Sequence, residues 1–210
     1  MTVTRIEPYH AKQVKVYLDG EFAFVLYKGE LSRYHIADGA ELDSATYRML
    51  TEEILVKRVR LRAMNLLTKR PYTEQGLRKK LREGMYPKWL EDNAVEYVKS
   101  YGYINDETYA MDYAMSMSGR YSLRMLRQKM REKGISEEVM ESCLADMEEE
   151  LLKGDEELLH TLIMKKTAGK GVPDDPSSRA KLMRFLAGKG FSSDMIQRAI
   201  RSEKQAESET

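Results

Sequence analysis

The stretch Ser122-Leu-Arg-Met-Leu126-Arg-Gln-Lys-Met130-Arg-Glu-Lys-Gly134 decides the fold. A hydroxyl residue opens it, Leu126 and Met130 follow four residues apart, and a glycine closes it. Serine caps helix N-termini, residues i and i+4 share one helical face, and glycine accepts the left-handed conformation at a helix end. The stretch therefore predicts a short amphipathic helix with a basic outer surface.

The same pattern occurs twice more, about 50 residues away on either side. One copy is 73–84, which opens with Thr73 and has one residue fewer before its glycine. The other is 178–190, which opens with Ser178. Apolar residues at helical spacing flank every copy. We interpret the pattern as tandem three-helix units with a basic middle helix, in which each unit buries too little surface alone and stacks on its neighbour.

These units predict a mainly α protein of three tandem three-helix repeats in an elongated, curved, solenoid-like array. The predicted domains are an N-terminal element, the three repeats and a disordered tail: 1–56, 57–104, 105–153, 154–202 and 203–210.

The first 55 residues have a different pattern, because their apolar residues alternate around Asp19-Gly20. That alternation predicts a β-hairpin, with a further strand over 3–7 and a turn over 8–12. Matching the apolar sets places Leu18 opposite Phe22 and predicts a three-residue loop. A connecting helix is expected to follow Asp43-Ser44.

Composition excludes several classes of protein. The chain has 210 residues, of which 42% are hydrophobic and 33% charged, so it is not disordered overall. Its apolar runs are too short for a membrane helix, and no signal-peptide core is present. Cys143 is the single cysteine, so no internal disulfide forms and we expect a cytoplasmic protein.

Signatures of enzymes and metal sites are also missing. There is no Walker A loop, no G-x-G-x-x-G, no G-x-S-x-G and no H-E-x-x-H. The three histidines are far apart in the sequence and only one cysteine accompanies them, which argues against a zinc site. We expect no catalytic, cofactor-binding or metal-binding residues and no membrane partner.

Charge is unevenly distributed although the net charge is only +1. Segment 57–84 has ten basic and two acidic residues, 119–134 has six and one, and 165–189 has seven and two. Acidic segments separate them, and 135–164 has one basic and ten acidic residues. Basic helices spaced by a repeat suit phosphate contacts along a polymer.

Three short motifs resemble the RecX family of recombinase regulators. They are Leu66-Leu-Thr-Lys-Arg-Pro-Tyr-Thr73, then Tyr101-Gly-Tyr-Ile-Asn-Asp-Glu-Thr-Tyr-Ala110, and Leu126 with Met130 and Lys133-Gly-Ile135. The resemblance covers about residues 50–202, and Asn105 stands where the family usually has an acid.

The resemblance implies a non-enzymatic helical-repeat protein that binds the RecA recombinase, particularly its filament on single-stranded DNA. It implies inhibition of ATP hydrolysis, filament growth and strand exchange, and so a role in DNA repair, homologous recombination and the SOS response. We expect the chain to be a monomer.

The predicted site residues form two sets. The contacts to the RecA–DNA filament are expected from basic residues in and around the middle helices: Lys69, Arg70, Arg78, Lys79, Arg82, Arg120, Arg124, Arg127, Arg131, Lys133, Arg179 and Arg184. The junction between repeats is expected from Gly102, Tyr103, Asn105, Asp106 and Tyr109, with both tyrosine rings packed inside it. Removing pairs of these arginines is expected to leave folding nearly intact.

Two other functions stay open at this stage. Three-helix units can resemble helix-turn-helix DNA-binding domains, although each third helix here is acidic or neutral. A pure protein-interaction solenoid would leave the basic helices merely solvated. Binding to single-stranded DNA with and without RecA separates the three.

Overall fold

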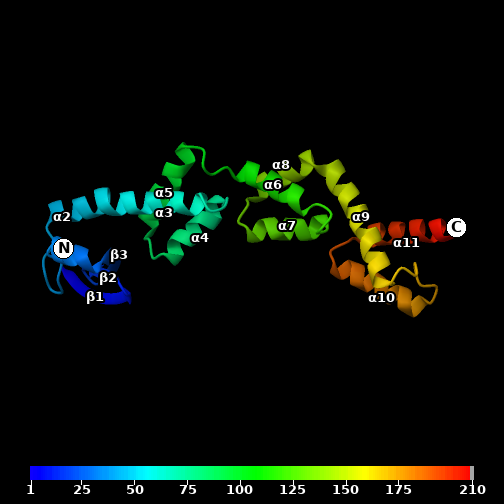
Figure 1. Ribbon diagram of the computed structural model, residues 1–210, viewed down its shortest axis with the longest axis horizontal. Coiled ribbons are helices and arrows are strands. Elements are labelled where there is room, and N and C mark those ends of the chain that lie inside the picture. Colours follow the sequence, from blue (N-terminus) through cyan, green and yellow to red (C-terminus); the bar gives the residue numbers. More distant parts are fainter. Residues whose placement is uncertain (209–210) are drawn as a thin grey trace. The chain divides into compact units, whose positions relative to one another are not determined.

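The structure is a computed structural model that describes residues 1–208, with side chains described through Gln205 (Figure 1). The chain divides into two units, Met1–Asn105 and Asp106–Thr210. The first unit contains a three-stranded sheet and helices, and the second contains helices in its described part.

The N-terminal sheet is antiparallel in the order β1-β2-β3, with β1 at Val3–His10, β2 at Gln13–Leu18 and β3 at Glu21–Tyr27. The expected turn over 8–12 is too long. Strand β1 continues through Pro8 to His10, which pairs with Gln13, so only two residues form the turn. Proline is accepted here because β1 is an edge strand.

The predicted three-residue loop between β2 and β3 is also wrong. Leu18 lies opposite Glu21, so the loop contains only Asp19 and Gly20, with φ values of 48° and 91°. Two positive φ angles are typical of the tight hairpin turn that matches strand twist. A bulge beyond the turn then places Val16 opposite Phe24. This extra residue in β3 restores the buried face, which sequence alternation alone could not show.

The helices of the first unit follow the sheet. They are α1 (Lys28–Arg33), α2 (Ser44–Arg48), the π-helical segment η1 (Met49–Leu55), α3 (Val56–Leu67), α4 (Glu74–Glu83) and α5 (Lys88–Ser100). Asp43 caps α2 through the amides of Ala45 and Thr46. From Ser44 to Leu67 no glycine or proline interrupts the chain, so the predicted boundary at 56/57 falls inside a continuous helical stretch.

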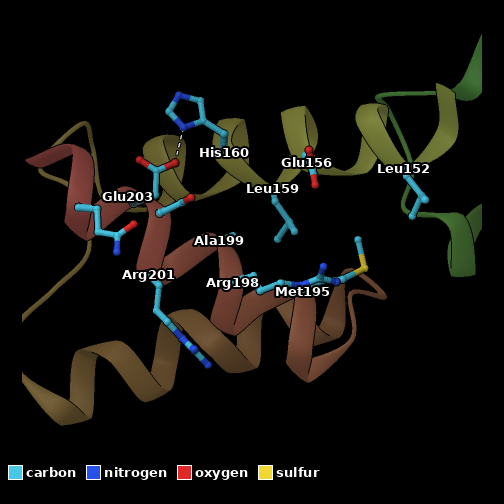
Figure 2. Close-up of a pocket in the computed structure, with 11 residues that line it drawn as sticks. Leu152, Glu156, Leu159, His160, Met195, Arg198, Ala199, Arg201 and Glu203 are labelled. Atoms are coloured by element: carbon cyan, nitrogen blue, oxygen red, sulfur yellow. Dashed lines mark hydrogen bonds and ion pairs between the residues drawn. The ribbon is translucent and has the colours of Figure 1, made fainter. Parts of the chain in front are cut away.

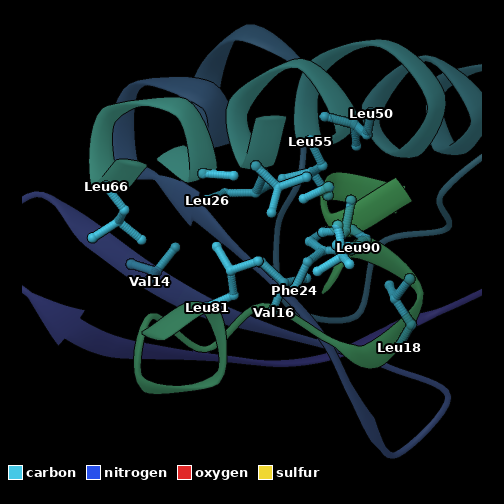
Figure 3. Close-up of a cluster of buried hydrophobic side chains, with 14 of the residues drawn as sticks. Val14, Val16, Leu18, Phe24, Leu26, Leu50, Leu55, Leu66, Leu81 and Leu90 are labelled. Carbon is cyan, nitrogen blue, oxygen red and sulfur yellow. The ribbon is translucent and has the colours of Figure 1, made fainter. Parts of the chain in front are cut away.

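One core joins the sheet to these helices, so residues 1–56 do not form a separate core. Val16 and Phe24 from the sheet, Leu55 from η1, and Leu81 and Leu90 from α4 and α5 are all nearly inaccessible to solvent. Figure 3 shows these side chains meeting between the strands and the helices. The sheet therefore buries one face against the first three-helix segment, formed by α3, α4 and α5.

The second unit contains two further three-helix segments. The second segment has α6 (Asp106–Met117), α7 (Leu123–Glu132) and α8 (Glu137–Asp146), and the third has α9 (Glu148–Lys166), α10 (Pro176–Gly188) and α11 (Ser193–Ser208). The predicted boundary at 153/154 falls inside α9. Three glutamates from Glu148 onward occupy its first turn, where negative charge stabilises a helix N-terminus.

Each segment of the second unit has its own buried cluster. Leu126, Met130 and Met140 are buried in the second segment, and Ile163 and Leu186 in the third. The two apolar residues four apart in each middle helix are buried as the repeat predicts, which explains why the same spacing recurs.

Caps define the ends of the middle helices, with two departures from the pattern. Thr73 and Ser122 accept backbone N–H groups from the first turn, as expected. In the third copy Asp175 is the N-cap instead of Ser178. Proline is favoured at the first helical position, so the helix already begins at Pro176, before Ser178. At the C-terminal end of the first copy, Met85 instead of Gly84 has a positive φ, 60°, since that copy is one residue shorter.

The expected disordered tail is wrong for residues 203–208, which continue α11. Glu203 lies beside His160 and Lys204 pairs with Asp174 at 2.7 Å, so two side chains attach this end of α11 to the third segment. Residues 209 and 210 of the predicted tail lie outside the described residues.

Candidate nucleic-acid interface

The basic face of α4 is largely neutralised by carboxylates. Arg78 donates to Glu74 at 2.9 Å and to Asp92 on α5 at 2.5 Å, and only 24% of its side chain is exposed. Arg82 lies 3.5 Å from the buried Glu91, also on α5. Burial raises the pKa of Glu91, whereas the hydrogen bond from Lys99, helped by Arg78, lowers the pKa of Glu74. These arginines therefore bind α5.

The basic face of α7 has the same arrangement. Arg127 makes two hydrogen bonds to Glu141 at 3.0 and 2.9 Å, and Arg131 makes two to Glu137 at 3.0 and 2.6 Å. Both acids belong to α8, and their pKa values lie below the ordinary value because of these hydrogen bonds. The acidic third helix of a segment thus supplies the anions that sequence analysis expected from a partner.

The other predicted contact residues differ in how they are held. Arg70 lies over the ring of Tyr72 at 4.6 Å, and Lys133 over that of Tyr113 at 5.6 Å. Arg179 donates to the carbonyl oxygens of Pro173 and Asp174, and Arg184 approaches that of Ala180. Four remaining cations are exposed and form neither hydrogen bonds nor ion pairs within the described part of the chain: Lys69, Lys79, Arg120 and Arg124.

Two lysines that sequence analysis did not select belong with this last group. Lys166, at the end of α9, and Lys189, after α10, lie 5.1 and 5.6 Å from the centre of the Phe185 ring. Both are exposed, and neither forms an ion pair with a described residue. The signal in the sequence is the absence of acids: 158–173 and 176–193 contain no Asp or Glu.

The predicted junction motif has one exposed ring where a buried one was expected. Tyr103 is 54% exposed and stacks on the exposed Tyr101, whereas the next residue, Ile104, is buried. Gly102 has a φ of 70°, so the chain turns sharply after α5 and directs Ile104 to the core of the first unit. The expectation that Tyr103 packs inside a junction is therefore wrong.

The remaining junction residues begin the second unit. Asn105 immediately precedes Asp106, where α6 begins. Tyr109 is half-buried and stacks on Tyr113 with their ring centres 6.3 Å apart. Tyr109 thus packs against the core of the second segment.

A polar contact inside the second unit joins the second and third segments. Ser122 donates its hydroxyl to the carbonyl of Lys189 at 2.7 Å, and the buried Asp155 accepts from the amide of Leu123. A methyl group built on Gly154 would lie 2.6 Å from Ser118 Oγ. The start of α7 is therefore closely packed against both α9 and the turn that follows α10.

The third segment also contains an open pocket of about 630 Å³ between α9 and α11 (Figure 2). Leu159 and Ala199 contribute apolar surface, while Arg198 and Glu203 contribute charges of both signs. His160 is hydrogen-bonded to Glu203 there. No group of three or more potential metal ligands occurs among the described residues. Within the same residues, no helix is long and apolar enough to span a membrane.

The fold defines a class of helical-repeat protein in which three-helix segments carry a basic middle helix. Family comparison matches residues 105–144 to the second three-helix domain of RecX and residues 154–200 to the third. Over these two domains the chain is similar to the RecX family.

Similarity to family members extends over nearly the whole chain. A regulatory protein RecX of Caldanaerobacter subterraneus is 27% identical over 205 residues, covering 95% of this chain and 98% of the relative. One from Clostridium beijerinckii is 24% identical and covers 96% and 94%.

Two solved structures share the fold. A crystal structure of regulatory protein RecX covers 96% of this chain and 99% of its own, with a TM-score of 0.65 and 24% identity. That of RecX from Lactobacillus salivarius covers 72% and 97%, with a TM-score of 0.60 and 19% identity.

Proposed function

We propose that this chain regulates the RecA recombinase by binding its filament on single-stranded DNA. It slows ATP hydrolysis, filament growth and strand exchange, performs no catalysis itself, and acts in the cytoplasm as a monomer. Through RecA it regulates DNA repair, homologous recombination and the SOS response. The observation that carries this proposal is similarity, over nearly its full length, to curated proteins named regulatory protein RecX.

The charge pattern supports a mixed protein–DNA target. Exposed cations without ion-pair partners suit phosphates, while exposed acids of 135–164 suit basic protein surface and would repel bare DNA. The helix-turn-helix alternative is less well supported. In the second segment the third helix, α8, directs Glu137 and Glu141 toward arginines of α7, and an acidic recognition helix would approach phosphates badly.

The test is RecA's ATPase activity on single-stranded DNA while this protein is titrated in. We expect substoichiometric amounts to slow hydrolysis and strand exchange, and the protein alone to hydrolyse neither ATP nor DNA. Unchanged ATPase activity together with no co-sedimentation with RecA filaments would contradict the proposal.

A further inference from the structure

We infer that a basic patch at the contact between the second and third segments binds phosphates of single-stranded nucleic acid directly. The junction patch consists of Arg120, Arg124, Lys166 and Lys189. This inference deepens the proposed function, on which it rests, by naming the surface that meets DNA.

The junction patch has no neutralising carboxylate partner among the described residues. All four residues are exposed, and none forms an ion pair with a described residue. The arginines one and two turns further along α7 behave differently, because Arg127 and Arg131 each make two hydrogen bonds to a glutamate. A cation already paired with a carboxylate gains little from a phosphate, whereas an unpaired one releases counterions when it binds.

Segments of the chain without acidic residues meet at this patch. No Asp or Glu occurs in 113–131, 158–173 or 176–193, which include α7 except its last residue, the end of α9 and all of α10. The nearby carboxylate of Asp155 is buried and accepts the amide of Leu123. The exposed charges contributed by these segments are therefore all positive.

Contacts between the two segments hold the patch together. The hydroxyl of Ser122 binds the carbonyl of Lys189. A Cβ built on Gly190 would lie 3.5 Å from the Cβ of Arg124, so α7 and the turn after α10 touch here. The same turn lies close to Lys166, because both lysines lie over the ring of Phe185. Arg124, Lys166 and Lys189 are thus held close together before a ligand arrives.

The occupant is a nucleic-acid strand because its phosphates recur along a chain and match several separate cations. An acidic protein segment is the competing occupant, and the experiment includes it as a separate arm.

The test measures fluorescence anisotropy of a labelled oligothymidylate over a salt series, without RecA. Two double variants of the patch are compared with the parent protein: Lys166→Ala with Lys189→Ala, and Arg120→Ala with Arg124→Ala. The matched control is the double variant Arg127→Ala with Arg131→Ala. We expect each patch variant to bind about tenfold more weakly, with a salt slope lower by about 1.4 for two lost phosphate contacts. The control should keep the parental slope, and all variants should keep the parental melting temperature.

A parent that fails to bind the oligonucleotide overturns the inference, and so do patch variants with the parental slope. Loss of binding to a poly-glutamate peptide with unchanged DNA binding would also overturn it, in favour of an acidic protein ligand. Co-sedimentation with RecA filaments is measured in parallel. If the parent protein binds oligothymidylate but does not co-sediment with RecA filaments, the proposed function is contradicted and the inference about the junction patch is not. If the patch variants bind both filaments and oligothymidylate as well as the parent does, only the inference about the junction patch is contradicted.

Discussion

Asp155, in the N-terminal half of α9, accepts the backbone N–H of Leu123, the first residue of α7, at 3.1 and 3.3 Å. These residues are 32 positions apart and belong to different three-helix segments. The carboxylate satisfies a helix N-terminal donor that no intrahelical carbonyl can reach. One buried side chain therefore both caps α7 and fixes the third segment against the second.

Asp155→Ala should destabilise the protein by roughly 1–3 kcal/mol, since it leaves a buried amide without its acceptor. Urea denaturation followed by circular dichroism measures this. The exposed Asp146, replaced in the same way, is the matched control and should change little. Equal effects at the two positions would show that the contact with Leu123 contributes nothing to stability.

The carboxylate of Asp155 also predicts the direction in which stability changes with pH. Burial raises the pKa of Asp155 above its ordinary value of 3.8, against the opposing effect of the hydrogen bond from Leu123. A raised folded-state pKa stabilises the protein fully below the unfolded-state pKa, and this contribution is lost as pH rises through the folded-state pKa. Asp155→Asn keeps an acceptor oxygen without the charge. The stability of the parent relative to this variant should therefore fall over a pH range that begins near the ordinary Asp pKa of 3.8 and extends upward. A constant difference across that range would contradict the prediction.

Gly154→Ala should also weaken the contact between these segments. The Cβ of the alanine would lie 2.6 Å from Ser118 Oγ and 3.1 Å from the backbone nitrogen of Gly119. The steric cost of these contacts should exceed the gain in helix propensity of alanine over glycine. We expect a loss of roughly 1–3 kcal/mol in unfolding free energy. Gly188→Ala is the control, because a Cβ there meets nothing within 4 Å. Adding Ser118→Ala should partly rescue Gly154→Ala, and absence of rescue would place the clash elsewhere.

The helical repeat could be predicted because its determinants are local. Leu77 and Leu81, like Leu126 and Met130, lie four residues apart behind a capping hydroxyl residue, and both pairs are buried. The predicted boundaries at 56/57 and 153/154 fall inside helical stretches. Helix α3 continues directly from η1 without a glycine or proline between them, and α9 already begins at Glu148, with a single residue between it and the end of α8. The predicted length of the hairpin loop was wrong because a bulge changes the pairing of β2 and β3 beyond the turn, and the sequence pattern does not show this bulge.

The candidate site was only partly predictable, because ion pairing is a tertiary property. Arg127 and Arg131 lie four residues apart and so share one face of α7, but the sequence could not show that Glu141 and Glu137 would pair with them. Conversely, Lys189 lies outside any helical charge pattern, and only its position beside Phe185 in the structure makes it a candidate contact residue.

Tyr103 and Ile104 form a pair of neighbours with opposite environments. Tyr103→Ala should leave the melting temperature nearly unchanged, because its ring is 54% exposed, and Ile104→Ala should cost about 2–5 kcal/mol because its side chain is buried. Thermal denaturation of both variants checks the prediction. A larger loss for Tyr103→Ala than for Ile104→Ala would reverse this assignment of the buried residue.

Arg78 and Arg131 should respond differently to the same substitution although both form ion pairs. The side chain of Arg78 is 24% exposed and bridges Glu74 and Asp92, whereas that of Arg131 is 53% exposed and binds Glu137 alone. Arg78→Ala leaves two carboxylates close to each other without their cation and should cost roughly 1–3 kcal/mol in unfolding free energy. This differs from the expectation, based on sequence, that such arginines are dispensable for folding. Arg131→Ala should scarcely change the melting temperature, because water and salt screen an exposed pair. Denaturation in low and high salt measures both variants, and an Arg78→Ala protein as stable as the Arg131→Ala protein would mean that α4 and α5 are held by their apolar contacts alone.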